Sequence, residues 1–196
     1  GRVAYPKAVD PNLEMLIKDD GKDTYLRHGG MVALGRIGEA APLIALKDHP
    51  SKSARIIAVV ALRRMQHEGV AEFLKDEDEY IVAEAARAIN DDWSIEAALP
   101  ALAEVLKETR FTSEPLLRRA INANSRVGKA ENIEILKDFA IRKNAPAKMR
   151  AEALATLSVW ANPSVLDRVD GRFRGASQRE ATPVVAALEP IMKNLL

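Results

Sequence analysis

Apolar residues recur along the chain at the spacing of amphipathic helices. In residues 55–65, with the sequence RIIAVVALRRM, the residues Ile56, Val59, Val60 and Met65 mark one helical face. Similar patterns of small and branched apolar residues occur in RHGGMVALGRI (27–37), AEAARAIND (83–91), RRAINANSRV (118–127) and RAEALATLSVW (150–160). Strand-like alternation is lacking outside one short stretch, so the sequence predicts an all-α fold.

A lysine-containing motif returns at near-regular intervals beside these helices. Its copies are LIKDD, ALKDH, FLKDE, VLKET and ILKDF, with the lysines Lys18, Lys47, Lys75, Lys107 and Lys137. The spacings between successive lysines are 29, 28, 32 and 30 residues. Such a period is typical of arrays in which each repeat is a helical pair and stacked pairs bury a continuous core. The sequence therefore predicts an α-solenoid of short helical pairs, with the motif near the end of each second helix.

One stretch departs from the repeat, and we expect an irregular loop or hairpin near residues 161–179. The Asp-Gly step within VDGR predicts a tight turn of a small hairpin. This stretch supplies a candidate docking loop for a neighbouring domain or an anion, with the residues Asp167, Arg168, Gly171, Arg172 and Arg174. The alternative, which we favour, is a loop that folds back with Asp167 paired locally to an arginine.

Arginines occupy similar places early in the first helix of several repeats, and aspartates precede two such helices. The residues are Arg27, Arg55, Arg118 and Arg150, with Asp48 and Asp76. One interpretation is a row of arginines that binds anions. We favour a structural ladder between repeats, in which the arginines pair with the aspartates and the aspartates cap the next helix.

Composition narrows the class of protein. The 196 residues include 29 basic and 28 acidic side chains, and this net charge of +1 argues against nucleic acid or a membrane surface as the main partner. No apolar run approaches the ~18 residues that a membrane span needs. The lack of cysteine excludes disulfides, cysteine-ligated zinc and thioether-attached haem. Trp93 and Trp160 each follow a repeat helix, and we expect both to be buried between repeats.

The motifs carry no evident chemistry. The histidines His28, His49 and His67 include no pair at the spacing of a helical metal site, and nucleophile and phosphate-loop motifs are lacking. Acidic clusters at 75–80 and 90–92 are of a type that binds calcium, but we favour helix capping for both. We therefore expect no catalytic residues, no cofactor and no metal site.

The repeat resembles short HEAT-like repeats. Over residues 24–180, the segments YLRHGGMVALGRIG, PLLRRAINANSRVG and RAEALATLSVWANPSVLDRVDGRFRG resemble the HEAT segment of large bacterial membrane-bound dehydrogenase proteins. The resemblance implies a preceding sugar-dehydrogenase-like β-propeller, a following c-type cytochrome domain, and a periplasmic or extracytoplasmic location. The family's DRVTGRWR-like segment is matched here at Asp167, Arg168, Val169, Gly171, Arg172 and Arg174. The haem-attachment motif CxxCH is absent, so no haem role passes to this chain.

Two functions follow as hypotheses. The first is a non-catalytic scaffold that positions the propeller against the cytochrome, or mediates contacts with another protein. The alternative is a ligand- or nucleic-acid-binding HEAT module of the DNA-glycosylase type, which would need a basic concave face with an exposed aromatic residue and a carboxylate. The near-neutral charge disfavours this alternative.

We expect residues 1–196 to form a single HEAT-like repeat domain cut from a longer multidomain protein, because the chain begins with glycine. The last stretch, TPVVAALEPIMKNLL (182–196), has a broad apolar face, and Pro190 should kink or divide its helix. Terminal repeats normally need a polar cap. We therefore expect Ile191, Leu195 and Leu196 to be partly exposed, or covered by a second copy in a weak homodimer.

Overall fold

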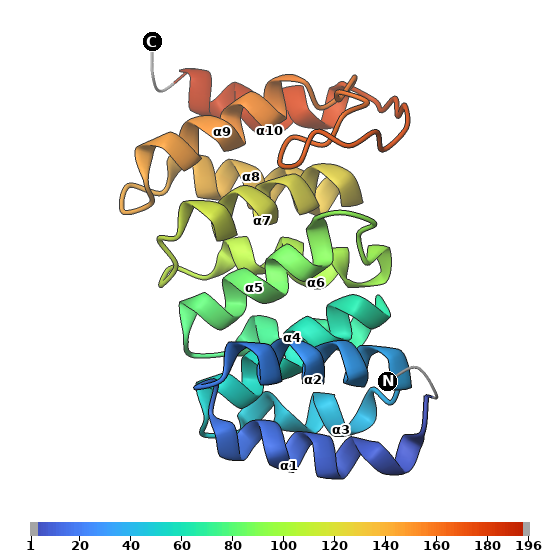
Figure 1. The fold of residues 1–196 in the computed structure, drawn as a ribbon. Coiled ribbons are helices and arrows are strands. Elements are labelled where there is room, and N and C mark those ends of the chain that lie inside the picture. Colours follow the sequence, from blue (N-terminus) through green and yellow to red (C-terminus); the bar gives the residue numbers. More distant parts are fainter. Residues whose placement is uncertain (1–3, 194–196) are drawn as a thin grey trace. The chain divides into compact units, whose positions relative to one another are not determined.

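The computed structural model describes the backbone of residues 4–193 and the side chains of residues 4–190. Every regular element in that part of the chain is a helix, and no β-strand occurs there (Figure 1). The all-α prediction is therefore confirmed. The chain divides into two compact units. The first comprises Gly1–Ile89 with Ser94–Ala98, and the second comprises Asn90–Trp93 with Leu99–Leu196.

The first unit is built from α-helices joined by short 3-10 helices. The elements are η1 (Pro6–Ala8), α1 (Val9–Asp19), α2 (Thr24–Ile37), α3 (Ala41–Ile44), η2 (Ala45–Asp48), α4 (Lys52–Met65), η3 (Glu68–Lys75), α5 (Glu79–Asn90) and η4 (Glu96–Ala98). The last residue of α5 belongs to the second unit. Helix α2 packs against α1 and α4, and α4 also packs against α3, η2 and η3. The core includes the fully buried side chains of Leu16, Leu34, Leu43, Ile57 and Leu62.

Local side chains fix where the helices of this unit begin and end. Asp23 Oδ1 accepts hydrogen bonds from the N–H groups of Tyr25 and Leu26, at 2.9 and 3.0 Å, and so caps α2. Ser51 Oγ accepts from the N–H of Ala54 at 3.2 Å and caps α4. Gly38 ends α2 in the left-handed conformation, with φ +86°, which glycine adopts without steric cost. These helices are therefore set by signals within a few residues of their ends.

Three copies of the lysine motif lie at the ends of 3-10 helices. Lys47 lies in the last turn of η2, Lys75 ends η3, and Lys107 ends the 3-10 helix η5 (Val105–Lys107) of the second unit. Lys137 differs, because α8 (Ala130–Ile141) continues for four residues beyond it. Phe139 lies in this extension and is 1% exposed, so the last turn of α8 is held by core packing.

The second unit is also helical. Besides η5 and α8, its helices are α6 (Leu99–Glu104), α7 (Glu114–Val127), α9 (Ala147–Ser158) and α10 (Thr182–Lys193). Helix α7 packs against α6, α8 and α9, while α8 packs against α9 and α10. Leu102, Leu116, Phe139 and Met149 are fully buried or nearly so, and they form the core between these helices.

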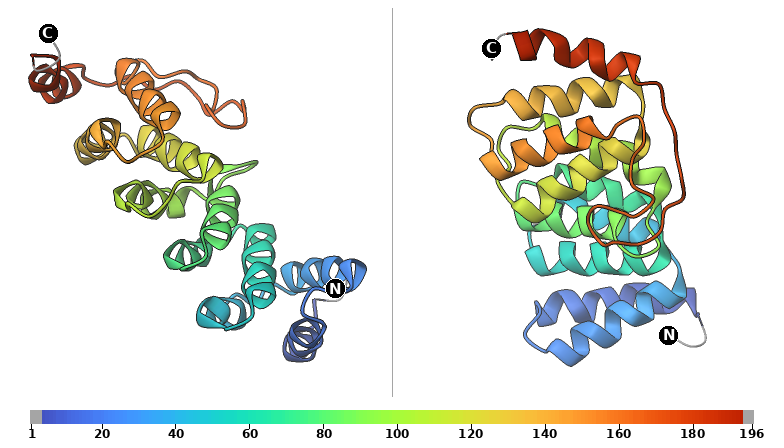
Figure 2. Two further views of the ribbon diagram at one scale, coloured as in Figure 1. Left: turned by 90° about the vertical axis from the view of Figure 1, so that its left-hand side faces the viewer. Right: turned by 90° about the horizontal axis from the view of Figure 1, so that it is seen from above.

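A long non-helical excursion, residues 159–181, separates α9 from α10 (Figure 2). Its middle is a small hairpin with one antiparallel bridge, between Leu166 and Phe173. The N–H of Asp167 donates to Arg172 O at 2.7 Å, and the N–H of Arg174 donates to Val165 O at 2.8 Å. The region predicted to be irregular is therefore a short hairpin inside a longer loop.

Pro190 lies within α10, as the sequence indicates, and Val185 of the same helix is 61% exposed. The predicted exposure of Ile191, Leu195 and Leu196 concerns side chains outside the described residues. None of the helices within residues 4–193 is both long and apolar enough to cross a bilayer.

Candidate functional site

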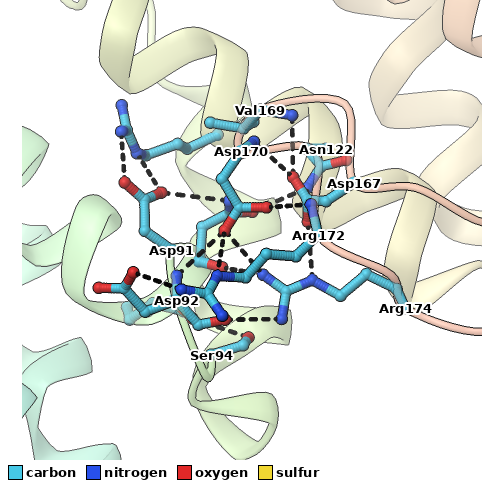
Figure 3. A network of polar contacts seen from close by, with 12 residues as sticks. Asp91, Asp92, Ser94, Asn122, Asp167, Val169, Asp170, Arg172 and Arg174 are labelled. Atoms are coloured by element: carbon cyan, nitrogen blue, oxygen red, sulfur yellow. Dashed lines mark hydrogen bonds and ion pairs between the residues drawn. The ribbon is translucent and has the colours of Figure 1, made fainter.

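A buried polar cluster holds the hairpin in the second unit (Figure 3). We use the name polar cluster for Asn90, Asn122, Asp167, Asp170 and Arg174, which come from the end of α5, from α7 and from the hairpin. All five residues belong to the second unit. Two of the candidate docking residues, Asp167 and Arg174, belong to this cluster, and the other three are next to cluster residues in the sequence.

Asp167 is the centre of the polar cluster, and its side chain is fully buried. Oδ1 accepts hydrogen bonds from the N–H groups of Val169 and Asp170 at 2.8 and 3.2 Å. Oδ2 accepts from Asn122 Nδ2 at 3.0 Å and from Arg174 Nε at 3.1 Å. Burial disfavours the charged carboxylate, but these hydrogen bonds outweigh it, so the pKa of Asp167 lies below its ordinary value.

Arg174 joins the hairpin to the turn at residues 90–93. Besides its bond to Asp167, its Nη1 donates to Asp92 O at 3.0 Å. Its Nη2 donates to Asn90 O at 3.0 Å and to Asp170 Oδ2 at 3.1 Å. All three guanidinium nitrogens are thus engaged, and the side chain is only 16% exposed. Arg174 therefore has a structural role, in agreement with the local pairing that we favoured for this loop.

The turns of the cluster are fixed by Asp170. Its Oδ2 accepts from the N–H of Asp92 at 3.0 Å, and its Oδ1 accepts from the N–H of Arg172 at 3.0 Å. Gly171 has φ +73°, the left-handed conformation that the Asp-Gly turn requires. Gly171 therefore shapes the hairpin, and any ligand contact would have to come from the side chains around it.

Side chains of α7 and α9 form hydrogen bonds and ion pairs with the cluster and with residues next to it. Arg119 makes a bidentate ion pair with Asp91, with N–O distances of 2.8 and 2.7 Å. Asn122 Nδ2 also donates to Asn90 Oδ1 at 2.8 Å. The docking candidate Arg168 donates twice to Glu152 Oε1 of α9, at 3.0 and 2.8 Å. The arginines of this region are therefore largely matched by carboxylates.

The opposite face of the hairpin is apolar and open to solvent. The hydrogen bonds on either side of the Leu166–Phe173 bridge make it a non-hydrogen-bonded pair, in which the two side chains lie close together on one face. Side chains alternate along a strand, so Asp167 and Arg174 point inward while Leu166 and Phe173 point outward. Leu166 is 49% exposed and Phe173 is 73% exposed.

Trp93 lies in the turn at 90–93, which Asp170 and Arg174 contact from the inward side of the hairpin. It is 78% exposed, and the Arg172 guanidinium lies 5.4 Å from the centre of its ring. We use the name hairpin surface for the exposed residues of this region, which are Leu166 and Phe173 on the outward face and Trp93 with Arg172 at the turn at 90–93. The expectation that Trp93 is buried is wrong, because the turn at 90–93 projects it away from the helices. The same expectation is confirmed for Trp160, which is 2% exposed.

Near the end of the excursion, Arg179 forms a hydrogen bond with the last turn of α7. Arg179 Nη2 donates to Ser125 O at 2.6 Å, and the guanidinium lies 4.7 Å from the centre of the Trp160 ring. Burial lowers the pKa of Arg179. Gly128 ends α7 with φ +68°, and a Cβ at this position would lie 2.6 Å from the guanidinium. A positive charge beside the last carbonyls complements the helix dipole.

The arginine ladder has one pair of the predicted type. Arg55 Nε lies 2.7 Å from Asp76 Oδ2, and its Nη1 donates to His49 O at 2.7 Å. Asp48 lines an open depression of about 370 Å³ beside Arg55 and Asp76. Arg27 lines a different depression, of about 540 Å³, near the start of α4.

The other two arginines of the predicted ladder have different partners. Arg118 Nη2 is 2.8 Å from Glu114 of its own helix, and its Nη1 is 3.5 Å from Glu152. Arg150 Nε donates to Ala140 O at 2.8 Å. Arg55, Arg118 and Arg150 thus have three different sets of partners, and a common ladder stays a prediction.

The histidines and acidic clusters with described contacts serve local structure. His67 Nδ1 accepts from the N–H of Gly69, and His49 Nδ1 accepts from the N–H of Ser51. Asp76 and Asp78 accept backbone N–H bonds near the start of α5, as caps do. Within the described residues, no group of three histidine, cysteine or acidic side chains is placed to hold a metal ion.

Sequence reasoning missed the partners of the hairpin. It placed Asn90 and Asp170 in turns, but it named neither of them, nor Asn122, as a partner of the hairpin; Asn90 and Asn122 are 0% and 3% exposed. One signal was present: in RRAINANSRV, Asn122 and Asn124 interrupt an otherwise apolar helical face. A polar side chain at a core position needs a partner, so these asparagines point to buried polar contacts without naming the partner.

No protein-family model matches the sequence, and no curated protein matches it at a significant level. The function must therefore be argued from the repeat pattern and from the geometry of the hairpin surface.

Proposed function

We propose that this chain is a HEAT-like α-solenoid segment that serves as a non-catalytic scaffold and contacts a protein partner through its hairpin surface. The near-regular period of the lysine motif supports the repeat architecture, as does the packing of sequence-adjacent helices within each unit. Such arrays have extended surfaces, and their insertions commonly lie on the binding face.

The exposed aromatic residues of the hairpin surface carry the proposal. A fully exposed Trp or Phe side chain presents about 150–250 Å², so Trp93 and Phe173 together expose on the order of 300 Å². Leu166 and Phe173 lie side by side on the outward face, and exposed apolar patches on soluble proteins frequently mark contact sites. Trp and Arg are also the residue types enriched among the side chains that dominate binding energy.

The polar cluster explains how a loop can present such a surface. Asp167 and Arg174 fix the inward face of the hairpin, and the outward face of Leu166 and Phe173 is fixed with it. Binding to an ordered loop avoids much of the conformational entropy that a flexible loop would lose. The buried ion pairs thus contribute to recognition by holding apolar side chains in place.

A larger parent protein would give the scaffold its role. The resemblance of residues 24–180 to the HEAT segment of membrane-bound dehydrogenase proteins supports a chain with a sugar-oxidising propeller on one side and a c-type cytochrome on the other, outside the cytoplasm. In such a protein the helical repeats space the two domains, and the hairpin surface is left for a protein contact. The chemistry would belong to the flanking domains.

The nucleic-acid alternative gains less support from the geometry. Arg168 and Arg174 of the loop are paired with Glu152 and Asp167, and Arg172 is within 3.3 Å of Asp92. Binding to DNA depends on unpaired positive charge that displaces counterions from phosphates. A loop with matched charges and exposed apolar residues is better suited to a protein.

Site-specific photo-crosslinking in the complete parent protein tests the proposal. The photoreactive residue p-benzoylphenylalanine is placed at Phe173, and in a control at Tyr25, which is 90% exposed and lies in the first unit. We expect a discrete protein adduct from position 173 and none from position 25. Equal labelling at both positions, or none at 173, would contradict a protein contact there. Salt-dependent binding to duplex DNA would instead favour the alternative.

A further inference from the structure

An open depression of about 540 Å³ lies at the start of α4 in the first unit. Its walls come from the turn that follows α1, from α2, from the first turn of α4 and from Tyr80 of α5. All of these residues belong to the first unit, whereas the hairpin surface belongs to the second. The depression is therefore a second candidate site, independent of the proposed protein contact.

Arg27 is the cation on the wall contributed by α2. It is half-buried, yet among residues 4–190 its guanidinium has no hydrogen bond and no ion pair. The arginines at similar repeat positions, Arg55, Arg118 and Arg150, all have partners. An arginine carries five N–H donors in a fixed fork that suits the oxygens of phosphate and carboxylate groups. Arg27 therefore presents unpaired donors to the depression.

The Ser53 hydroxyl faces the same space. Its oxygen is buried and has no hydrogen-bond partner within the described part of the chain, although buried polar atoms are normally paired. A Cβ at Gly21 would lie 3.0 Å from Ser53 Oγ and 3.6 Å from Arg27 Nη1. Because Gly21 has no side chain, this space is left open, and one small group placed there can contact both the hydroxyl and the guanidinium.

The first turn of α4 adds backbone donors to the same wall. Ser51 Oγ accepts from the N–H of Ala54, but the N–H groups of Lys52 and Ser53 have no acceptor within their own helix. The start of a helix also carries the positive end of its dipole, which favours an anion. The Lys52 ammonium is 2.6 Å from Asp78 and is therefore already paired.

A carboxylate in the wall limits how tightly an anion can bind. Asp20 lines the depression, and its Oδ1 accepts a hydrogen bond from Ser51 Oγ at 2.7 Å. Its negative charge opposes an anion in the same space, while Arg27 and the start of α4 attract one. We therefore expect affinities in the millimolar range.

We propose that this depression binds a phosphoryl group, either as free phosphate or at the end of a small phosphate ester. A phosphoryl group has three terminal acceptor oxygens that point in different directions, which suits a guanidinium, a hydroxyl and backbone N–H groups that come from two helices. A carboxylate has only two oxygens in one plane. The depression is larger than a phosphate, and the 53% exposed ring of Tyr80 at its wall is available to an organic part of the ligand.

An NMR titration of the isotopically labelled chain tests the site. Inorganic phosphate, added at constant ionic strength, should shift the amide signals of Lys52 and Ser53 with saturation in the millimolar range. Arg27→Gln should weaken binding by about tenfold or more, because a hydrogen bond to a charged group is lost, and Ser53→Ala should weaken it as well. Arg36→Gln is the matched control, since Arg36 is an exposed arginine in the last turn of the same helix α2 and should bind phosphate like the wild type.

The fold of each variant is followed by its thermal melt. Neither Arg27 nor the Ser53 hydroxyl has a side-chain partner among residues 4–190, so both variants should melt like the wild type. Weaker binding with an unchanged melt then reports on the site itself.

Two further probes identify the ligand class. Acetate should bind more weakly than phosphate, and equal affinity would overturn a phosphoryl site. Phenyl phosphate should bind more tightly than inorganic phosphate if the ligand is an ester whose organic part contacts Tyr80, whereas equal affinity would assign the site to free phosphate. Shifts that never saturate, or affinities that are the same in the wild type, Arg27→Gln and Ser53→Ala, would overturn the proposal.

Discussion

Replacing Asp167 by asparagine removes the charge at the centre of the polar cluster while keeping the size of the side chain. The carboxylate accepts hydrogen bonds from two backbone N–H groups, from Asn122 and from Arg174, and Arg126 Nη1 lies 3.6 Å away. In the variant the amide NH₂ group can accept none of these bonds, and two arginines of low exposure, Arg126 and Arg174, each lose one anionic neighbour. Arg174 keeps its contacts to Asp170 and to two backbone carbonyls.

Loss of one partner from a buried ion pair destabilises a protein by about 3–5 kcal/mol. We expect the lower end, about 3 kcal/mol, because Arg174 retains other acceptors. Urea unfolding has slopes of about 1–3 kcal/mol per molar for small proteins, so the midpoint should fall by roughly 1–3 M. Both tryptophans of the chain, Trp93 and Trp160, lie in the second unit, so intrinsic fluorescence follows this unit selectively.

The pH dependence of stability provides a second test of the Asp167→Asn variant. The folded-state pKa of Asp167 is lowered, so its contribution to stability is fully present above the unfolded-state pKa of about 3.9 and is lost as the pH falls through the folded-state pKa. The difference in stability between wild type and Asp167→Asn should therefore be constant near neutral pH and shrink below about pH 4.

A surface carboxylate provides the control. Asp138 has a side chain that is 67% exposed and lies 3.7 Å from Lys137, so Asp138→Asn should change stability by less than about 1 kcal/mol. Equal urea midpoints for the wild type and Asp167→Asn at pH 7 would refute the reasoning. So would a difference between them that does not change in acid.

Three further variants test the packing. Leu62→Asp places a charge at a fully buried position of α4 and should destabilise the first unit by several kcal/mol, seen as a lower midpoint by circular dichroism. Gly128→Ala, at φ +68° and 2.6 Å from the Arg179 guanidinium, should lower the stability of the second unit by about 1–3 kcal/mol by fluorescence. Arg55→Gln breaks the 2.7 Å contact with Asp76 and should destabilise the first unit by about 2 kcal/mol; an unchanged melt would mean that this pair is not structural.

Local patterns in the sequence determined which segments became helices. The apolar periodicity around Ile57 and Leu62 depends only on residues within one helix, and both side chains are fully buried. The caps at Asp23 and Ser51 act on N–H groups two or three residues away. The Asp-Gly turn at Gly171 is equally local. These features follow from short-range geometry, so a reading of the sequence can find them.

Contacts between distant segments were decided only by the tertiary structure. Arg174 bonds to a carbonyl 84 residues earlier, and Asn122 bonds to Asp167 across 45 residues. The sequence indicated that Asp167 and Arg174 belong to one loop. It did not indicate that Asn122 donates a hydrogen bond to Asp167, or that the carbonyl of Asn90 accepts one from Arg174. Several arginines and aspartates have equivalent local patterns, and which of them meet depends on how helices pack.

The exposure of the two tryptophans also depends on the tertiary structure and not on the local sequence. Trp93 and Trp160 both follow a repeat helix and have the same local signal, yet one is 78% exposed and the other is 2% exposed. The return of the excursion brings Arg179 onto the Trp160 ring, whereas Trp93 lies in the turn at 90–93 and stays exposed. Periodicity identifies the apolar side of a helix, but burial depends on what the rest of the chain places over it. The sequence alone thus determined the helices and the hairpin turn, and the tertiary structure decided which tryptophan is buried and which is exposed.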